Sequence, residues 1–167
     1  KCGFDYYSGN FNGAITDYYN YPIITNGVTS TVTAYATTQT VNDAINWLDT
    51  ITTNKPYFLW LAFNAPHTPL HIPPSTLTTV TGLTGTTTDM NINGNKYLKA
   101  ALEALDTEIG RLFTYLTTNN LMDSTNIIFI GDNGNDSRTS HNPIKTKSKN
   151  TLYNYGVRVP MIISGPS

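Results

Sequence analysis

The spacing of apolar residues along the chain predicts two helices. The apolar residues within 40–56 fall on one face of a helix. Thr40 is the expected N-cap. Pro56 marks the end, because the residue before a proline disfavours helical backbone. A longer stripe predicts a helix over residues 95–120. The Thr- and Gly-rich residues 75–94 are interpreted as a loop. The predicted buried faces are Val41, Ala44, Ile45, Leu48 and Ile51, and then Leu98, Ala101, Leu102, Leu105, Ile109, Leu112, Phe113 and Leu116.

Three continuous apolar runs predict buried strands, at residues 57–63, 126–132 and 159–167. The first run, YFLWLAF, is apolar on both faces, as a strand must be when helices cover both sides of its sheet. Helix, strand, helix, strand, loop and strand in this order indicate an α/β domain with a largely parallel sheet flanked by helices. Three core strands are few for such a sheet, so we expect an incomplete domain.

The first 27 residues are rich in Tyr, Gly and Asn. They are interpreted as loops with room for one short strand. Their tyrosines could pack in a core or line a substrate rim, and packing is the favoured interpretation.

Polar side chains follow two of the predicted strands at the point where each ends. His67 comes after the first strand, and Asp132 and Asn133 come after the second. Ligands of open α/β sheets bind outside the carboxyl ends of the strands, so we expect the three residues on one rim. Taken alone, His67 more often represents a satisfied loop histidine, and His71 and His141 are weaker candidates still.

Asp132 and Asn133 permit two interpretations. A carboxylate and an amide oxygen are hard ligands that suit Ca²⁺ or Mg²⁺ and suit zinc poorly, although two ligands are fewer than the six to eight that Ca²⁺ takes. The other interpretation is an ordinary turn in which Gly134 adopts positive φ. The nearby run KTKSKN is similarly ambiguous. Its lysines, Lys145, Lys147 and Lys149, could form a solvated charge run, or one of them could pair with an anionic group.

Composition excludes several classes of function. Charged residues make up only 13% of the chain and the net charge is −1, which leaves no electrostatic footprint for nucleic acid. No apolar run approaches the roughly 20 residues that a membrane span needs. Cys2 is the only cysteine, so neither an internal disulfide nor a cysteine-based zinc site is possible.

Several segments, in their order along the chain, resemble sulfatases of the arylsulfatase type. They are GFDYYSGNFNGA, KPYFLWLAFNAPHTPLHIPP, ALDTEIGRL, IIFIGDNG and KNTLYNYGVRVPMIISGPS. The resemblance covers nearly the whole chain and implies the alkaline-phosphatase-like α/β fold. It also implies that residues 1–167 form one partial catalytic domain, without the nucleophile region that precedes these segments and without the C-terminal region that follows them.

The resemblance assigns roles residue by residue. Asp132 and Asn133 match two calcium ligands of the family, with Mg²⁺ the less favoured ion. His67 matches a histidine that contacts the sulfate ester and its leaving oxygen, and Lys149 matches a lysine that contacts the sulfate. The implied activity is calcium-dependent hydrolysis of a sulfate ester, on a sulfated small molecule or carbohydrate. Export, to the periplasm or out of the cell, is expected from the family alone.

The chain also departs from the family pattern. The nucleophile of the family is a formylglycine made within a C/S-x-P-x-R segment, and no such segment occurs here; Cys2 is followed by Gly3 and Phe4. The usual Glu-Gly pair is replaced by Asn154 and Tyr155. We therefore expect this chain by itself to be inactive. Two alternatives stay open: a phosphoesterase or phosphonate hydrolase of the same superfamily, and an inactive sulfatase-like domain that only binds ligands.

Overall fold

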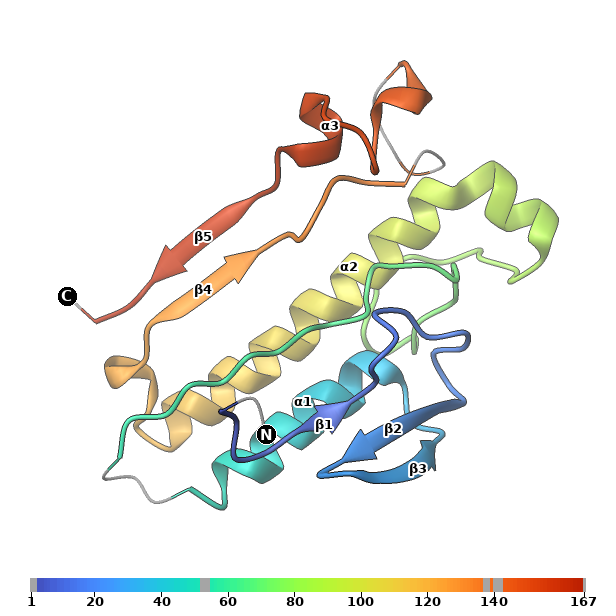
Figure 1. The fold of residues 1–167 in the computed structure, drawn as a ribbon. Helices are drawn as coiled ribbons and strands as arrows, with labels where there is room; N and C mark the ends of the chain where they lie inside the picture. Colours follow the sequence, from blue (N-terminus) through green and yellow to red (C-terminus); the bar gives the residue numbers. More distant parts are fainter. Residues whose placement is uncertain (1–2, 52–54, 137–138, 140–142, 167) are drawn as a thin grey trace. The chain divides into compact units, whose positions relative to one another are not determined.

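The computed structural model describes residues 3–51, 55–136, 139 and 143–166 (Figure 1). The chain divides into two compact units. Unit 1 consists of Lys1–Gly85 with Lys96–Leu112, and unit 2 consists of Thr86–Asn95 with Phe113–Ser167. Helices and strands both occur, which confirms the predicted α/β class.

Unit 1 opens with a small antiparallel sheet of three strands, β1 (Ser8–Gly9), β2 (Tyr21–Thr25) and β3 (Val28–Val32). Asn26 and Gly27 join β2 to β3 with φ values of 49° and 91°. Positive φ at both central residues is the geometry of the two-residue turns that connect twisted antiparallel strands, and Asn-Gly is their preferred sequence. The expectation of loops with one short strand before residue 27 therefore missed this hairpin, in which β2 pairs with both β1 and β3.

Helix α1 (Ala36–Leu48) starts before and ends short of its predicted bounds. The Thr40 hydroxyl donates to the carbonyl of Ala36 (3.1 Å) inside the helix instead of capping it. The helix start is set by tertiary contact, since the backbone N–H of Ala36 donates to the carbonyl of Tyr18 (2.9 Å). Its buried face is largely as predicted and comprises Ala36, Thr37, Val41, Ala44 and Leu48.

Tyrosines form much of the core of unit 1, which confirms their interpretation as packing residues. The ring of Tyr18 lies 5.9 Å from that of Tyr35, and Tyr35 lies 5.4 Å from Tyr19, measured between centroids. Aromatic pairs at this separation add stability beyond the area they bury. The core cluster consists of Ile15, Tyr18, Tyr21, Ile23, Tyr35, Ala36, Ala65 and Ala104.

The long helix α2 (Thr87–Thr118) runs through segments of both units. The side chain of Thr86 caps it by accepting the N–H of Asp89 (3.2 Å), so the end of the predicted loop 75–94 is in fact helical. Non-helical backbone at Asn93 (φ −110°, ψ 24°) marks a kink near the predicted start. The helix ends at Asn119 as expected. Four of the eight residues of the predicted stripe, Ala101, Leu105, Leu112 and Leu116, are buried. Leu102 is exposed, and Glu108, outside the stripe, is buried.

Residues 57–63, predicted as a buried strand, pair with no other strand among the described residues. Their side chains still alternate between half-buried and exposed positions, the period of an extended chain. Phe58 and Trp60 are 72% and 71% exposed. The apolar pattern indicates an extended segment but supplies no neighbour to pair with it.

The elements of unit 2 after α2 are short. They are η1 (Met122–Ser124), β4 (Ile127–Ile130), η2 (Lys145–Lys147), α3 (Asn154–Val157) and β5 (Met161–Ser164). Strands β4 and β5 pair antiparallel, with Ile128 opposite Ile163. The predicted largely parallel sheet is therefore wrong for the strands described. A parallel pair needs a crossover that carries the chain back to the starting end of the first strand. Here the connection returns the chain beside β4 in the opposite direction (Figure 1).

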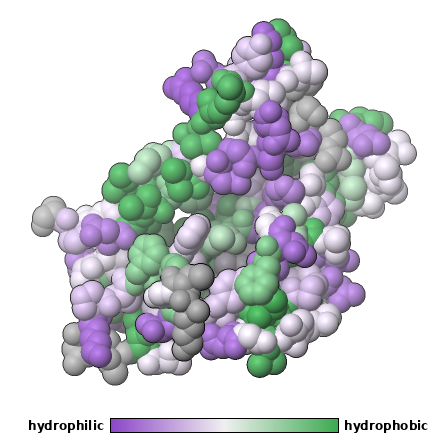
Figure 2. Space-filling view, in the orientation of Figure 1, coloured by the Kyte–Doolittle hydropathy of each residue, from purple (hydrophilic) through white to green (hydrophobic). Residues whose placement is uncertain are grey.

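Both faces of the β4–β5 ribbon are apolar and exposed, where buried strands were expected. Ile128 is 61% and Ile163 is 65% exposed, and Figure 2 shows a hydrophobic surface over these strands. A two-stranded ribbon has no second layer to bury its side chains. Among the described helices, none combines the length and the apolar character that crossing a bilayer would require.

Candidate active site

His67 is held in unit 1 by bonds to its ring and to its backbone. Its N–H donates to the carbonyl of Asn64 (2.8 Å), and its own carbonyl accepts from the Tyr18 hydroxyl (2.8 Å). Its Nδ1 lies 2.8 Å from the carbonyl oxygen of Thr68. Because a carbonyl can only accept, Nδ1 carries the proton in this bond. Nε2 is then the ring nitrogen left for a substrate.

His71, one of the weaker candidates, has a structural role. Its ring stacks on Tyr18, with centroids 3.6 Å apart. Its Nδ1 bonds the Pro69 carbonyl (3.0 Å), which leaves Nε2 to accept the Tyr35 hydroxyl (2.9 Å). Burial lowers the pKa of His71, against the opposing effects of the Pro69 carbonyl and Asp17. Burial also raises the pKa of Tyr35 to about 12, so its hydroxyl remains a donor.

Asp132 and Asn133 lie in unit 2, directly after β4. Asp132 is exposed and Asn133 is half-buried. One carboxylate oxygen of Asp132 accepts the backbone N–H of Asn133 (2.8 Å), which holds the acid over the following residue. This hydrogen bond supports the turn interpretation. It uses only one carboxylate oxygen of Asp132, and the second oxygen is available to a ligand.

Gly134 is required for close packing and not for positive φ, which corrects the turn interpretation. A Cβ at this position would collide with the carbonyl oxygen of Tyr155, while the backbone N–H of Gly134 donates to the carbonyl of Gly156 (2.9 Å). A side chain at Gly156 would in turn meet backbone carbonyls of Ser148 and Thr151. Gly134 thus lets the segment after β4 approach α3, and Gly156 lets α3 approach residues 148–151.

Lys149 is tied to the same segment of unit 2. Its backbone N–H donates to the carbonyl of Asn135 (3.0 Å), two residues beyond Asn133. Its neighbour Ser148 is only 2% exposed, and the Ser148 hydroxyl has no hydrogen-bond partner among the described residues. Three predicted site residues, Asp132, Asn133 and Lys149, are therefore brought together by backbone hydrogen bonds. His67 belongs to unit 1, and its convergence with them stays a prediction.

The other candidates add little. His141 and Cys2 lie outside the described residues. Lys147 lies over the ring of Tyr153, with Nζ 4.4 Å from the centroid. Sequence reasoning missed Tyr18, which bonds the carbonyl of His67, and Tyr35, which bonds the ring of His71. No signal in the sequence separated these two from the other tyrosines, since their role depends on contacts between distant segments.

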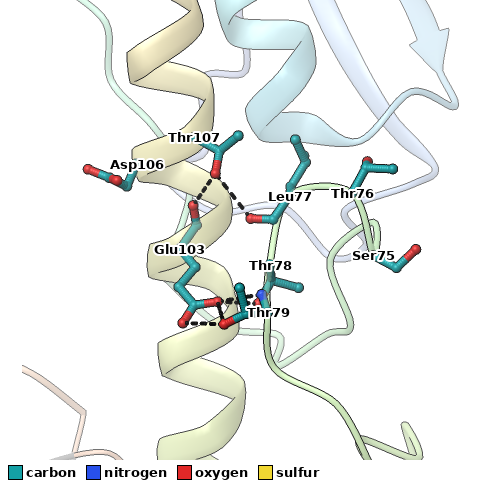
Figure 3. Close-up of a pocket in the computed structure, with 8 residues that line it drawn as sticks. All are labelled: Ser75, Thr76, Leu77, Thr78, Thr79, Glu103, Asp106 and Thr107. Atoms are coloured by element: carbon teal, nitrogen blue, oxygen red, sulfur yellow. Dashed lines mark hydrogen bonds between the residues drawn. The ribbon is translucent and has the colours of Figure 1, made fainter.

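A shallow groove of about 410 Å³ in unit 1 contains none of the predicted site residues (Figure 3). Glu103 accepts the Thr78 hydroxyl (2.8 Å) and the Thr79 backbone N–H (2.7 Å). These bonds, from Thr78 first, lower the pKa of Glu103 to about 2. The carboxylate is thus ionised, and Asp106 adds a second acid. Such a groove repels a sulfate ester. Its lining is Ser75, Thr76, Leu77, Thr78, Thr79, Glu103, Asp106 and Thr107.

The ligand types in unit 2 suit a hard cation, but the two residues Asp132 and Asn133 supply too few ligands to complete its coordination. A carboxylate and an amide oxygen suit calcium. Within the described part of the chain, no group of three or more His, Cys, Asp or Glu side chains is placed to hold a metal. Asp132 and Asn133 could therefore contribute part of a calcium site, with the remaining ligands from elsewhere.

A family model described as Sulfatase matches residues 1–167. The chain therefore belongs to the sulfatase family, which confirms the resemblance read from its segments. A relative in Escherichia coli (strain K12), named "Uncharacterized sulfatase YdeN", is 32% identical over 165 residues. The match covers 96% of this chain and 28% of YdeN, so the chain spans well under half the length of that relative.

Solved structures share the fold. Ps i-CgsB superposes with a TM-score of 0.78 at 29% identity, covering 99% of this chain and 40% of that one. Another structure of Ps i-CgsB is a complex with k-i-k-neocarrahexaose. BT4656, solved in complex with its substrate D-glucosamine-2-N,6-O-disulfate, superposes with a TM-score of 0.73 at 20% identity, covering 98% of this chain and 50% of that one. The predicted sulfatase fold is confirmed, apart from the parallel sheet.

Proposed function

We propose that the whole protein is a sulfuric ester hydrolase that acts on a sulfated carbohydrate. The observation that carries the proposal is the sulfatase family match over residues 1–167. The local arrangement in unit 2 supports it, because hard oxygen ligands and a lysine occur on segments joined by backbone hydrogen bonds. The carbohydrate substrate class is supported by the sugar ligands of the structural relatives, Ps i-CgsB and BT4656.

Calcium is the metal that we propose for this site. Asp132 and Asn133 would hold it together with ligands from beyond the described residues. When bound, a divalent ion stabilises the negative charge that develops on the sulfuryl oxygens. Magnesium is the less favoured ion, because it requires a near-ideal octahedron and releases its water reluctantly.

Lys149 and His67 are proposed to act on the ester itself. Lys149 contributes a positive charge that pairs with a sulfate oxygen. His67 keeps the Nδ1 proton in its bond to Thr68, so its Nε2 is the atom that meets the leaving oxygen. With a proton on Nε2 as well, the imidazolium donates it to the departing oxygen, a contribution typically worth about 100- to 10,000-fold in rate.

The nucleophile is proposed, by family resemblance, to be a formylglycine. This chain contains no C/S-x-P-x-R segment in which that residue could form. The 167 residues by themselves should therefore give no turnover of sulfate esters above background. Export of the protein to the periplasm or beyond the cell stays a prediction from the family.

The test is hydrolysis of 4-nitrophenyl sulfate and of 4-nitrophenyl phosphate by the intact protein. We expect the sulfate to be preferred, and chelation by EGTA to abolish turnover until calcium is restored. Asp132→Ala should reduce kcat/KM by at least about 100-fold, the typical cost of losing one charge-stabilising group. Asp123→Ala removes an exposed acid of the same unit and is the matched control.

Three outcomes would change the assignment. A preference for the phosphate ester would favour the phosphoesterase alternative. Binding of sulfated sugar without turnover would favour an inactive binding domain, consistent with Asn154 and Tyr155 in place of the usual Glu-Gly pair. Turnover that survives both EGTA and Asp132→Ala would exclude the proposed calcium site.

A further inference from the structure

We propose that Tyr18 is a positioning residue for His67. Its hydroxyl fixes the backbone of the segment that carries the imidazole, and so holds Nε2 against the departing oxygen of the ester. This inference rests on the proposed function, in which His67 assists the leaving group. It concerns only unit 1, where every contact used below is found.

Tyr18 is a rigid donor because its whole side chain is confined. It is 1% exposed and is one of the largest fully buried side chains of the described chain. Its ring stacks on His71 with an angle of 20° between the planes. The hydroxyl then reaches the carbonyl of His67 at 2.8 Å. Because packing fixes the Tyr18 ring, the hydrogen bond from its hydroxyl also fixes the position of the His67 carbonyl.

The segment that contains His67 is held at three of its carbonyls by side chains. Tyr18 donates to the carbonyl of His67, His71 donates to that of Pro69 (3.0 Å), and Tyr19 donates to that of Ile72 (2.7 Å). Tyr35 donates to Nε2 of His71 and thereby keeps the His71 proton on Nδ1. Side-chain donors that bond backbone carbonyls in this way favour one backbone path, because each alternative path gives up these bonds.

The imidazole of His67 is coupled to this backbone by its own hydrogen bond. Nδ1–H donates to the carbonyl of Thr68, the adjacent residue. The orientation of the ring therefore depends on the backbone conformation of His67 and Thr68. The Tyr18 hydroxyl fixes the carbonyl of His67, which begins this stretch of backbone. Loss of the Tyr18 hydroxyl should loosen this backbone and let the ring move.

The reaction provides a measurement that separates positioning from stability. In hydrolysis the proposed nucleophile forms a bond to sulfur as the bond between sulfur and the ester oxygen breaks. The electron pair of the broken bond stays on that oxygen, and a proton from His67 neutralises it. A phenol with a low pKa leaves readily without that proton, whereas a phenol with a high pKa depends on it. A misplaced proton donor therefore penalises poor leaving groups more than good ones.

The experiment compares kcat/KM for a series of substituted phenyl sulfates, from 4-nitrophenyl to 4-methoxyphenyl, in the intact protein. Tyr18→Phe keeps the ring and its stack on His71 but removes the donor. We expect about a 10-fold or greater loss for 4-methoxyphenyl sulfate and less than about a threefold loss for 4-nitrophenyl sulfate. The dependence on leaving-group pKa should approach that of His67→Ala, and the double variant should lose nothing further.

Tyr21→Phe is the matched control. The Tyr21 side chain is also buried in unit 1, and its hydroxyl has no hydrogen-bond partner among the described residues. This variant should keep the wild-type dependence on leaving-group pKa. Equal losses for every ester in Tyr18→Phe would show a purely structural role and would overturn the proposal.

A second measurement does not depend on turnover and so separates this proposal from the proposed function. Nitrogen NMR of ¹⁵N-labelled histidine should show the Nδ1–H tautomer of His67 in the neutral ring. In Tyr18→Phe the resonances should shift toward an average of the two tautomers, whereas Tyr21→Phe should leave them unchanged. An unchanged His67 spectrum in Tyr18→Phe would overturn the proposal even if the protein hydrolysed no sulfate. Absence of turnover in the wild type would instead count against the proposed function.

Discussion

The two units hold their predicted site residues by opposite means. In unit 1 the segment around His67 is fixed by side chains, chiefly the hydroxyls of Tyr18 and Tyr19 and the ring of His71. In unit 2 the segments around Asp132 and Lys149 are joined by backbone hydrogen bonds.

This difference determines which kind of substitution each unit can accept. Removing a side-chain atom from unit 1 breaks a bond, and the buried partner stays unpaired. In unit 2 the segment after β4 approaches α3 because Gly134 lacks a side chain, so adding one atom there is the damaging change. The apolar ribbon of β4 and β5 adds no packed core to unit 2, since its side chains are exposed.

The largest effect is expected from Arg111→Met in unit 1. Arg111 donates to the buried carboxylate of Glu108 (2.7 Å) and to the Asn42 side chain of α1 (2.9 Å). The variant leaves the buried Glu108 charge without its cation. Because the Arg111 side chain is 40% exposed, the loss should lie below the roughly 3 to 5 kcal/mol that breaking a fully buried pair costs. Urea unfolding of the intact protein, followed by fluorescence, measures the loss.

Lys99→Met is the control for that prediction. Lys99 forms an ion pair with Glu103 (3.6 Å), but its side chain is 67% exposed. Exposed pairs of this kind contribute less than about 1 kcal/mol. If Arg111→Met and Lys99→Met lowered the free energy of unfolding by similar amounts, the ion pair of the buried Glu108 would contribute no more stability than an exposed one.

The next effect is expected from Gly134→Ala in unit 2. The added methyl group collides with the carbonyl of Tyr155, and backbone cannot yield as a flexible side chain does. Overpacking of this kind typically costs about 1 to 3 kcal/mol. It should also separate the segments that carry Asp132 and Lys149, so calcium affinity measured by isothermal titration should fall in parallel with stability.

Gly110→Ala is the matched control in the same chain. Gly110 lies within α2 and has open space where a Cβ would be added. Alanine in a helix interior should raise stability by about 0.5 to 1 kcal/mol. Tight packing at Gly134 would be disproved by a Gly134→Ala variant that kept wild-type calcium affinity and stability.

The smallest effect is a pH dependence that comes from His71. Burial holds the pKa of His71 below its usual 6.5, so the unfolded chain binds a proton more readily than the folded chain. The stabilisation is complete above pH 6.5 and is lost as the pH falls through the folded pKa. The limiting slope is about 1.4 kcal/mol per pH unit.

Unfolding free energies at pH 5 and pH 7.5 test this dependence. The difference between the two values should shrink in His71→Phe, which retains an aromatic ring on Tyr18 but cannot titrate. An identical difference in the two proteins would show that His71 is protonated as readily in the folded state as in the unfolded one.

Helix periodicity predicted both long helices, and their errors have local causes. The α1 start was misplaced because the carbonyl of Tyr18, distant in sequence, receives the first N–H. The N-terminal turns of α2 were missed because their residues lack an apolar stripe, although Thr86 caps them. The Asn26-Gly27 hairpin could have been predicted from its turn sequence.

The candidate site was only partly accessible to prediction. Asp132 and Asn133 could be identified because oxygen donors follow an apolar strand, and Lys149 came from resemblance. The bonds that join their segments involve glycine and backbone atoms, which carry no side-chain pattern. Tyr18 could not be selected from among the tyrosines, because only its contact with the carbonyl of His67 distinguishes it.

For this protein, sequence by itself determined the family, the helical segments and the residue types available to the proposed sulfate and calcium chemistry. These follow from local spacing and from side-chain chemistry, and both can be read from the sequence without knowledge of the fold. Only the tertiary structure decided the antiparallel pairing of β4 with β5, the exposure of their apolar faces and the tyrosine support of His67. Each depends on which distant segments meet, and an apolar strand pattern is compatible with many partners and with either direction of pairing.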